Sequence, residues 1–232
     1  MFSNGAFESR QYFKAYDILI GECFPYKHLL KTILKELNIK RQDKVLDVGC
    51  GTGNFLKILK ATRVEKITGI DNSEFALEFC KQKVPEARLL KLDIRKPLPF
   101  QNNEFDKIVV INVLYLLTKK ERGEILKELY RVLKNNGKIA VVNPKRGGKN
   151  VKIFLDDVRE TIKRYGFLKG GLRFLRSLKT FSFMFLPYIK KVSPKNFLLP
   201  QEQEKMLKSC GFKILKTNSI YAQQAILTIG KK

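Results

Sequence analysis

Three glycines at alternate positions, Gly49, Gly51 and Gly53, follow an acidic residue, Asp47, near the end of an apolar run. Glycine has no side chain, so the backbone can bend sharply there and approach a ligand closely. A second acid, Asp71, ends the next apolar run and would complete a pocket for a polar nucleoside. The spacing therefore predicts a loop that holds a nucleoside-containing cofactor.

Strand-like and helix-like patterns alternate around this loop. Near-continuous apolar runs separated by amphipathic segments are typical of a parallel sheet with helices on both faces. A helical region is expected up to about residue 38, followed by helices at 54–60, 74–83, 119–133 and 201–209. Strands are expected at 44–48, 66–71, 87–92, 106–111, 138–142, 212–217 and 221–229.

The glycine spacing also distinguishes between cofactors. A dinucleotide-binding loop would have its third glycine at position 54, where Asn54 stands. The GxGxG pattern preceded by Asp47 resembles motif I of the class I S-adenosylmethionine-dependent methyltransferases. Further segments resemble the methyltransferase type 11 branch, which includes the ubiquinone and menaquinone C-methyltransferases. These segments are Leu92-Asp93-Ile94 and residues 97–100, 104–109 and 129–137. In all, the resemblance extends over residues 12–142 and again at 211–212.

The resemblance implies a Rossmann-like three-layer α/β sandwich, with a mostly parallel seven-stranded sheet, an antiparallel last strand and a helical lid or insertion. It implies S-adenosyl-L-methionine as the cofactor. In such a site Asp47 would help to hold the methionine amino group, and Asp71 would accept the ribose hydroxyls. Asp93 would bind the adenine amino group, with Ile94 beside the base. The other cofactor-binding candidates are Gly49, Cys50, Gly51, Gly53, Asn72 and Asn112.

Each of these residues also has a purely structural interpretation. The glycines could only form a tight strand–helix turn, and Asp71 could only cap the following helix. Asp93 could form a turn before Pro97. Cys50 fits a small packing residue, since no base lies near it in the sequence.

The acceptor side of the site is less defined. In related enzymes a histidine pair often follows the fourth strand, but Tyr115 and Leu116 stand there in this chain. No general base is evident, so the catalytic residues stay unknown, and the missing histidines weaken any carry-over of the acceptor from the quinone enzymes. Tyr12 and Tyr16, with Tyr115, are substrate or lid candidates; aromatic packing of an N-terminal helix on the sheet explains the first two equally well.

The domain organisation follows from these patterns. We expect a single methyltransferase domain over residues 1–232, with an N-terminal helical lid at 1–40 and a basic helical insertion at 145–196, after the fifth strand. Residues 145–195 hold 14 Lys or Arg and 3 Asp or Glu, among Phe, Leu and Tyr side chains. Such a segment could lie on an anionic membrane, line a pocket for a lipid-like acceptor or contact RNA. It could also bury its apolar side on the domain and expose its lysines to water.

The whole chain is strongly basic, with 46 Lys and Arg against 22 Asp and Glu and a formal net charge of +24 over 232 residues. Such a charge attracts anionic partners, although solvated surface lysines explain it as well. Four scattered cysteines and a single histidine, His28, show no metal-ligand or disulfide spacing. No signal peptide is evident, and no apolar stretch is long enough to span a membrane. We therefore expect a reducing, cytoplasmic location, with peripheral membrane contact open.

The expected function is methyl transfer from S-adenosylmethionine to a small-molecule or lipid-like acceptor. An RNA or protein methyltransferase that uses the basic insertion to bind its substrate is the alternative, with nucleic acid the weaker partner. A cofactor-binding protein without activity is a third hypothesis, against which the intact motifs argue. The sequence does not define the oligomeric state.

Overall fold

The computed structural model describes residues 9–148, 150–172, 174–175 and 196–232. Seven strands form one sheet in the order β3-β2-β1-β4-β5-β7-β6. Strands β1 to β5 are parallel, and β7 is antiparallel to both of its neighbours, β5 and β6, which confirms the expected topology. The strands are β1 (Lys44–Val48), β2 (Lys66–Asp71), β3 (Arg88–Lys91), β4 (Phe105–Ile111), β5 (Leu133–Pro144), β6 (Lys213–Ile220) and β7 (Ala225–Lys231).

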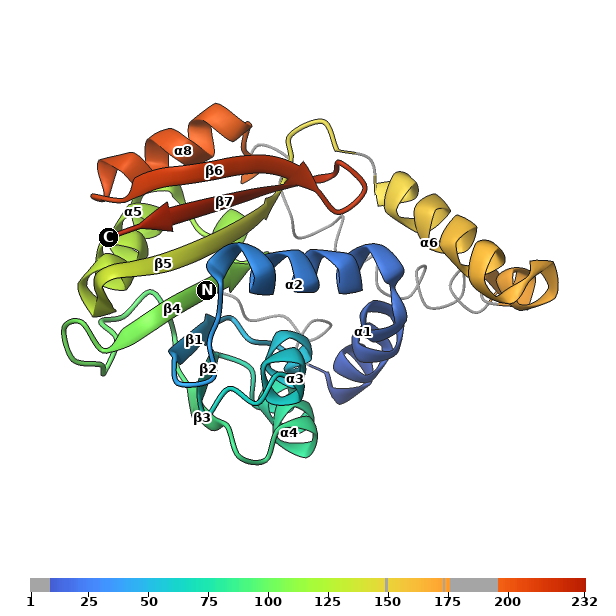
Figure 1. The fold of residues 1–232 in the computed structure, drawn as a ribbon, viewed down its shortest axis with the longest axis horizontal. Helices are drawn as coiled ribbons and strands as arrows, with labels where there is room; N and C mark the ends of the chain where they lie inside the picture. Colours follow the sequence, from blue (N-terminus) through green and yellow to red (C-terminus); the bar gives the residue numbers. More distant parts are fainter. Residues whose placement is uncertain (1–8, 149, 173, 176–195) are drawn as a thin grey trace.

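Helices cover both faces of the sheet, so the domain has three layers (Figure 1). The helices α2, α3 and α4 pack on one face, and α5 and α8 pack on the other. Helix α1 lies against α2 and α4, and α6 lies against α2. The helices are α1 (Arg10–Glu22), α2 (Phe24–Leu37), α3 (Asn54–Ala61), α4 (Glu74–Lys83), η1 (Leu114–Leu116), α5 (Lys119–Val132), α6 (Asn150–Tyr165) and α8 (Pro200–Ser209).

The two hydrophobic cores explain why the central strands contain few polar residues. Along β1, Val45 packs into the core under α2 and α3, whereas Leu46 and Val48 pack into the core under α5. Successive side chains of a strand point to opposite faces, so a strand covered on both sides must be apolar throughout. Asp47 interrupts this run and is 2% exposed, which makes it the exception that needs an explanation.

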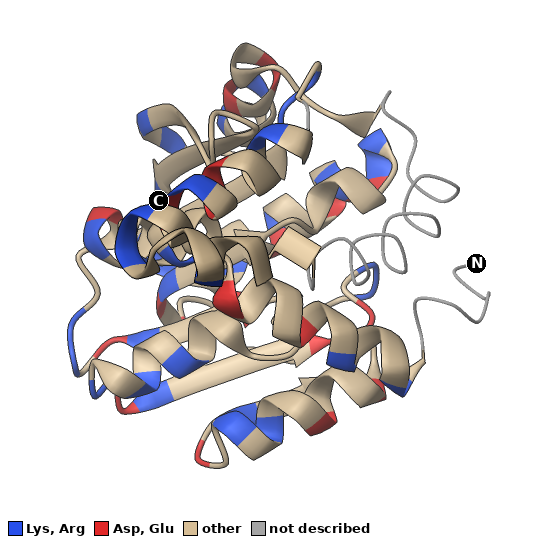
Figure 2. Ribbon diagram, turned by 90° about the vertical axis from the view of Figure 1, so that its right-hand side faces the viewer, with Lys and Arg blue, Asp and Glu red and all other residues tan. Residues whose placement is uncertain are grey.

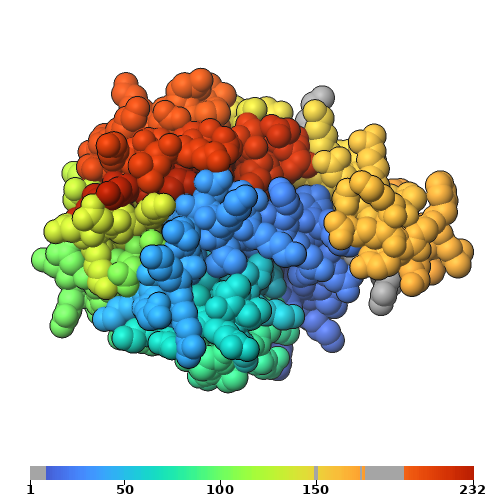
Figure 3. Space-filling view, in the orientation of Figure 1, coloured from blue at the N-terminus to red at the C-terminus, as the bar shows by residue number. Residues whose placement is uncertain are grey.

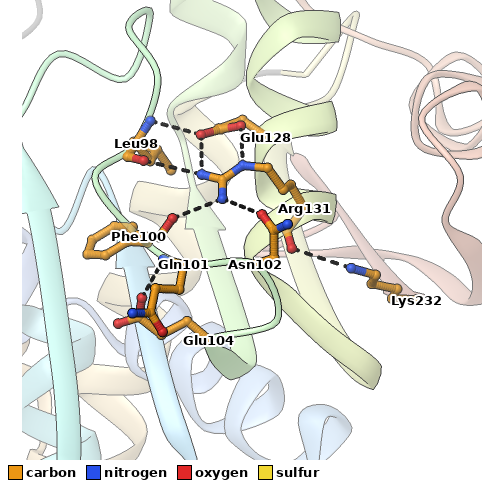
Figure 4. A network of polar contacts seen from close by, with 8 residues as sticks. All are labelled: Leu98, Phe100, Gln101, Asn102, Glu104, Glu128, Arg131 and Lys232. Carbon is orange, nitrogen blue, oxygen red and sulfur yellow. Dashed lines mark hydrogen bonds and ion pairs between the residues drawn. The ribbon is translucent and has the colours of Figure 1, made fainter.

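Helix α5 fixes the loop that follows β3. Its start has the predicted capping box, in which Thr118 and Glu121 exchange backbone-to-side-chain hydrogen bonds of 2.7 and 3.3 Å. Near its end, the Arg131 guanidinium donates to the carbonyl oxygens of Phe100 and Leu98, at 2.9 and 3.2 Å (Figure 4). Glu128 accepts from the Leu98 N–H at 2.9 Å, so the loop is held from both sides.

The expected element boundaries differ from the structure most at two places. Strand β5 begins at Leu133 rather than at residue 138, because Leu133 already pairs with Phe105 before a register shift. Strand β7 begins at Ala225 rather than at residue 221. The preceding residues Tyr221, Ala222 and Gln223 all have positive φ, between 55° and 64°, and form the turn after β6.

The segment between β5 and α8 begins and ends with non-helical chain, joined by a bridge between Lys145 and Leu198, and its described middle part is mostly helical. Helix α6 leads to Gly166, and residues 167–172 and 174–175 are helical again. Figure 1 shows α6 extending outward from the edge of the sheet domain. The rest of the predicted insertion, including its uncharged segment 180–189, lies outside the described residues. Among the described helices, none has the length and apolar character needed to cross a bilayer.

Candidate cofactor-binding site

The glycine-rich loop connects β1 to α3 and is hydrogen-bonded to the end of β2. Gly49, Gly51 and Gly53 have φ values of 71°, 52° and 79°, which is the left-handed region that disfavours other residues. The backbone N–H groups of Gly49 and Cys50 both donate to the Ile70 carbonyl oxygen, at 2.8 and 3.0 Å. The loop therefore bends back over the carboxyl end of β2.

Each glycine of the loop has a different reason to be glycine. A Cβ on Gly49 would collide with the side chain of Val113, in the loop after β4. A Cβ on Gly53 would lie 2.5 Å from the Cys80 sulfur and 3.2 Å from the backbone of α4. A Cβ on Gly51 would meet no atom within 4 Å, so its backbone faces open space. That is the property expected of a loop that a ligand approaches.

Asp71 braces this loop from the end of β2. Its Oδ2 accepts a hydrogen bond from the Gly51 N–H at 2.9 Å, and its Oδ1 accepts one from the Ser73 N–H at 2.9 Å. The cap of α4 is Ser73, whose hydroxyl accepts from the Ala76 N–H at 3.3 Å, so Asp71 is not the capping residue. Burial raises the pKa of Asp71, and the backbone hydrogen bonds partly offset this rise.

Asp47 is a buried carboxyl group beside Asp71. Burial first, and then the negative charge of Asp71, raise the pKa of Asp47 to about 8. None of the ion pairs between described residues involves Asp47. A buried acid without a cation is costly, so this position fits the binding of a positively charged ligand group.

Helix α1 is attached to the loop through a polar cluster that the sequence did not predict. Asp17 accepts a hydrogen bond from the Thr52 hydroxyl at 2.7 Å and forms an ion pair with Lys83 at the end of α4. Lys83 also donates to the Asn54 side chain at 3.2 Å. Thr52 is 1% exposed, so the contact closes the loop on the side of α1.

Two tyrosines from α1 and α2 lie near the buried acids. The Tyr26 hydroxyl is hydrogen-bonded to Tyr16, and burial raises the pKa of Tyr16 to about 12. The charge of Asp47 contributes to the raised pKa of both hydroxyls, so both lie near this carboxyl group. Tyr12 stacks on Tyr16 with ring centroids 6.4 Å apart. The predicted lid residues therefore approach the site, and Tyr26 joins them.

The other predicted cofactor residues take varied positions. Cys50 is 7% exposed and its thiol contacts Cys80 on α4, so only its backbone is available to a ligand of the glycine loop. Asn72 is exposed, and Asn112 has a φ of 55° with its N–H bonded to the Val142 carbonyl at 2.9 Å. Ile94 packs against the α5 core. Asp93 accepts hydrogen bonds from the Arg95 backbone and guanidinium, so its turn-forming role is realised in this structure.

The loop after β4 and the segment that precedes α8 are joined by a buried cation, Arg122. Its guanidinium donates to the carbonyl oxygens of Leu114, Leu117 and Asn196, at 2.7, 3.0 and 2.9 Å. Tyr115 lies in this loop and is buried against Phe197, with ring centroids 5.8 Å apart. The predicted acceptor residue Tyr115 thus faces the segment that returns from the insertion.

The sheet order, the glycine loop and the acids at the ends of β1 and β2 together define a class I S-adenosylmethionine-dependent methyltransferase. Residues 45–137 match the family described as a methyltransferase domain. The chain is 30% identical over 213 residues to the protein named "Putative methyltransferase YqeM" of Bacillus subtilis, covering 86% of this chain and 84% of that protein. It is 32% identical over 175 residues to the demethylmenaquinone methyltransferase of Thermotoga maritima, covering 74% of this chain and 71% of that protein.

Solved structures agree with this fold. An S-adenosylmethionine-dependent methyltransferase from Aquifex aeolicus superposes with a TM-score of 0.65 at 19% identity, over 96% of this chain and 98% of that one. This chain belongs to the class I S-adenosylmethionine-dependent methyltransferases, in the methyltransferase type 11 branch. It is an enzyme whose cofactor is S-adenosyl-L-methionine.

Proposed function

We propose that this enzyme methylates a small apolar acceptor with an electron-rich ring, of the hydroquinone type. The cofactor supplies a methyl group that its sulfonium already activates, so the protein needs to position the acceptor and exclude water rather than build a nucleophile. The names of the demethylmenaquinone methyltransferases among the relatives support this acceptor class. The finding that carries the methyl-transfer part of the proposal is the convergence of Asp47, Asp71 and the open Gly51 backbone at the carboxyl ends of β1 and β2.

The cofactor would be held by groups with complementary chemistry. Asp71 has acceptor capacity beyond its two backbone donors, as the ribose hydroxyls require. Asp47 lacks a cation among the described ion pairs, and the cofactor amino group would provide one. We assign the adenine to Ile94 and Asp93, where binding requires Asp93 to share or release Arg95. Tyr12 and Tyr16 on α1 would cover the methyl side.

The acceptor side would lie along the loop after β4. Residues 113–117 are Val, Leu, Tyr, Leu and Leu, and the one titratable side chain among them, Tyr115, is buried. An acceptor with a proton of high pKa would need a general base from this loop. A ring carbon of a hydroquinone does not, because the ring hydroxyls supply the electron density that forms the new carbon–methyl bond as the sulfonium carbon–sulfur bond breaks, and the proton displaced from the ring leaves to solvent when the products are released.

The acceptor class is tested by methyl transfer from tritiated S-adenosylmethionine to three substrates: a demethylated naphthohydroquinone in detergent micelles, total RNA and a protein extract. We expect radioactivity in the organic extract of the hydroquinone reaction and none in the RNA or protein precipitates. Label in either precipitate, with none in the organic phase, would contradict the proposal. S-adenosylhomocysteine binding is measured in parallel, so that an inactive preparation is recognised.

The raised pKa of Asp47 predicts that cofactor binding depends on pH. The carboxyl group keeps its proton in the free enzyme up to about pH 8, whereas a bound ammonium group favours the charged form. The affinity for S-adenosylhomocysteine should therefore rise between pH 6 and 7.5, by up to about 10-fold per pH unit. Isothermal titration in two buffers of different ionisation enthalpy should show the release of about one proton.

Asp47→Asn is the matched control for this prediction, since it retains the shape but cannot ionise. In the absence of cofactor, the free energy of unfolding changes with pH in the opposite direction to the binding affinity. A raised carboxyl pKa stabilises the fold most below about pH 4, and this contribution is lost as the pH rises to about 8. The Asp47→Asn variant should bind S-adenosylhomocysteine more weakly and lose most of the pH dependence of this binding. If it keeps the wild-type pH profile, Asp47 does not hold the amino group.

A further inference from the structure

The described part of the insertion is a helical hairpin attached to the N-terminal helices. Gly166 has a φ of 85° and breaks the helix after α6. The helix that follows, over residues 167–172 and 174–175, is called the returning helix, and it packs back on α6. A Cβ on Gly170 would collide with Ile162, and the centroids of the Phe154 and Phe174 rings lie 5.2 Å apart. The faces that the two helices turn toward each other are therefore occupied by this packing.

The hairpin is also anchored to the domain. Asp157 on α6 accepts a hydrogen bond of 2.7 Å from the Phe24 N–H, at the first turn of α2. A carboxylate stabilises a helix at its N-terminus. The Arg164 guanidinium lies over the Phe24 ring at 4.8 Å. The orientation of the hairpin on the domain is therefore fixed by polar and aromatic contacts, and Figure 3 shows this part of the molecule protruding to one side.

The outer face of the returning helix is apolar and exposed. Leu168, Leu172 and Leu175 follow the spacing i, i+4, i+7 of a single helix face, and Phe167 precedes them. Their exposed fractions are 81%, 58%, 64% and, for Phe167, 82%. We call these four residues the outer patch. Four large apolar side chains so exposed on one short helix are unusual on a protein surface that faces only water.

Basic side chains accompany the outer patch. Lys163 and Lys169 are exposed on the two helices, and Lys169 lies 5.7 Å from the centre of the Tyr165 ring. Figure 2 views the molecule from the side on which α6 lies and shows Lys and Arg spread over its helices. The whole chain carries a net charge of +24. Exposed apolar groups beside cations are complementary to an anionic lipid bilayer, whose headgroups are negatively charged and whose interior is apolar.

We propose that the outer patch docks on the surface of an anionic lipid bilayer, with Phe167, Leu168, Leu172 and Leu175 inserted at the level of the headgroups. Aliphatic side chains predominate in the patch, and these bind acyl chains but do not stack on bases. Two copies of a chain with this net charge repel each other, which disfavours pairing of the patch with itself. The inference depends on the surface alone and stands apart from the proposed acceptor.

The test is flotation of the whole chain with two kinds of vesicle. One contains phosphatidylcholine alone, and the other contains phosphatidylcholine with about 30 mol% phosphatidylglycerol, which is anionic. We expect binding to the mixed vesicles, at least ~10-fold weaker binding to phosphatidylcholine alone, and a decrease as salt rises from about 0.05 to 0.5 M. Equal binding to both vesicle types, or binding to neither, would overturn the proposal.

Two sets of variants separate the apolar and the electrostatic parts. The triple change Leu168→Ser, Leu172→Ser and Leu175→Ser should reduce vesicle binding at least ~10-fold, because each removed side chain loses its transfer from water. The pair Lys163→Gln and Lys169→Gln should reduce the preference for phosphatidylglycerol. Phe75→Ser and Leu215→Ser serve as the control, since these apolar side chains are 38% and 44% exposed elsewhere on the domain.

Each variant is also assayed for S-adenosylhomocysteine binding and thermal unfolding, which should stay at wild-type values because the patch contacts neither core. If the triple variant binds vesicles as well as the control does, the patch is not the docking surface. Retained vesicle binding that total RNA competes away from wild type and triple variant alike would assign the surface to nucleic acid and also overturn the proposal.

Discussion

Asp71→Ala is expected to weaken S-adenosylhomocysteine binding by at least ~100-fold while the chain stays folded. The side chain holds the glycine loop through the Gly51 N–H and the start of α4 through the Ser73 N–H. Removing it also removes the proposed acceptor of the ribose hydroxyls. Hydrogen bonds to a charged group contribute about 1.5–3 kcal/mol each, and two of them correspond to a loss of this size. Isothermal titration measures the change.

Glu74→Ala is the matched control for Asp71→Ala. Glu74 lies three residues further along the chain, but its carboxylate is exposed and pairs with Lys91 at 2.8 Å. An exposed ion pair contributes little to stability. The control should bind the cofactor product as the wild type does. Binding by Asp71→Ala within a few-fold of wild type would remove Asp71 from the cofactor site.

Arg122→Met should lower the free energy of unfolding by about 2–4 kcal/mol, since it removes the guanidinium that donates to several carbonyl oxygens in a largely buried site. Arg122 is 5% exposed, and its three closest acceptors are the Leu114, Leu117 and Asn196 carbonyls. Urea unfolding followed by circular dichroism measures this loss. Methionine keeps much of the side-chain volume, so the effect reports the lost hydrogen bonds rather than a cavity.

Arg122→Lys should recover only part of this stability, because an ammonium group cannot reproduce the fork of donors. Arg159→Met on α6 is the comparison for a surface arginine, since the Arg159 side chain is 79% exposed. It should be close to wild type. If Arg122→Met unfolds at the wild-type urea concentration, Arg122 does not hold the loop after β4 against the segment that precedes α8.

Much of the sheet was predictable because each buried strand leaves a local pattern. Strands β1 and β2 and helix α4 have the predicted bounds, since apolar runs and the Ser73 cap mark their ends. The turn at Tyr221 left no such signal. Three consecutive residues with positive φ and no glycine go against local preference, at about 1–2 kcal/mol per residue. Only tertiary contacts, such as the 5.9 Å ring contact of Tyr221 with Tyr26, can hold that turn.

The candidate site divides in the same way. Asp47, Asp71 and the glycines were found because they lie within one motif or at a strand end. The contact of Asp17 with Thr52 joins residues 35 positions apart in the sequence, and no spacing rule relates them. Arg122 was not predicted because an arginine on an amphipathic helix normally faces water. Its burial depends on the carbonyls of a loop whose path the sequence does not specify.

The close approach of Gly49 to the Val113 side chain couples the glycine loop to the loop after β4. A bulkier residue at position 113 would press on the glycine loop, which is proposed to bind the methyl donor. Substitutions at this position should therefore also disturb cofactor binding. Directed changes of acceptor range should therefore begin at the 40% exposed Leu116 and leave Val113 unchanged.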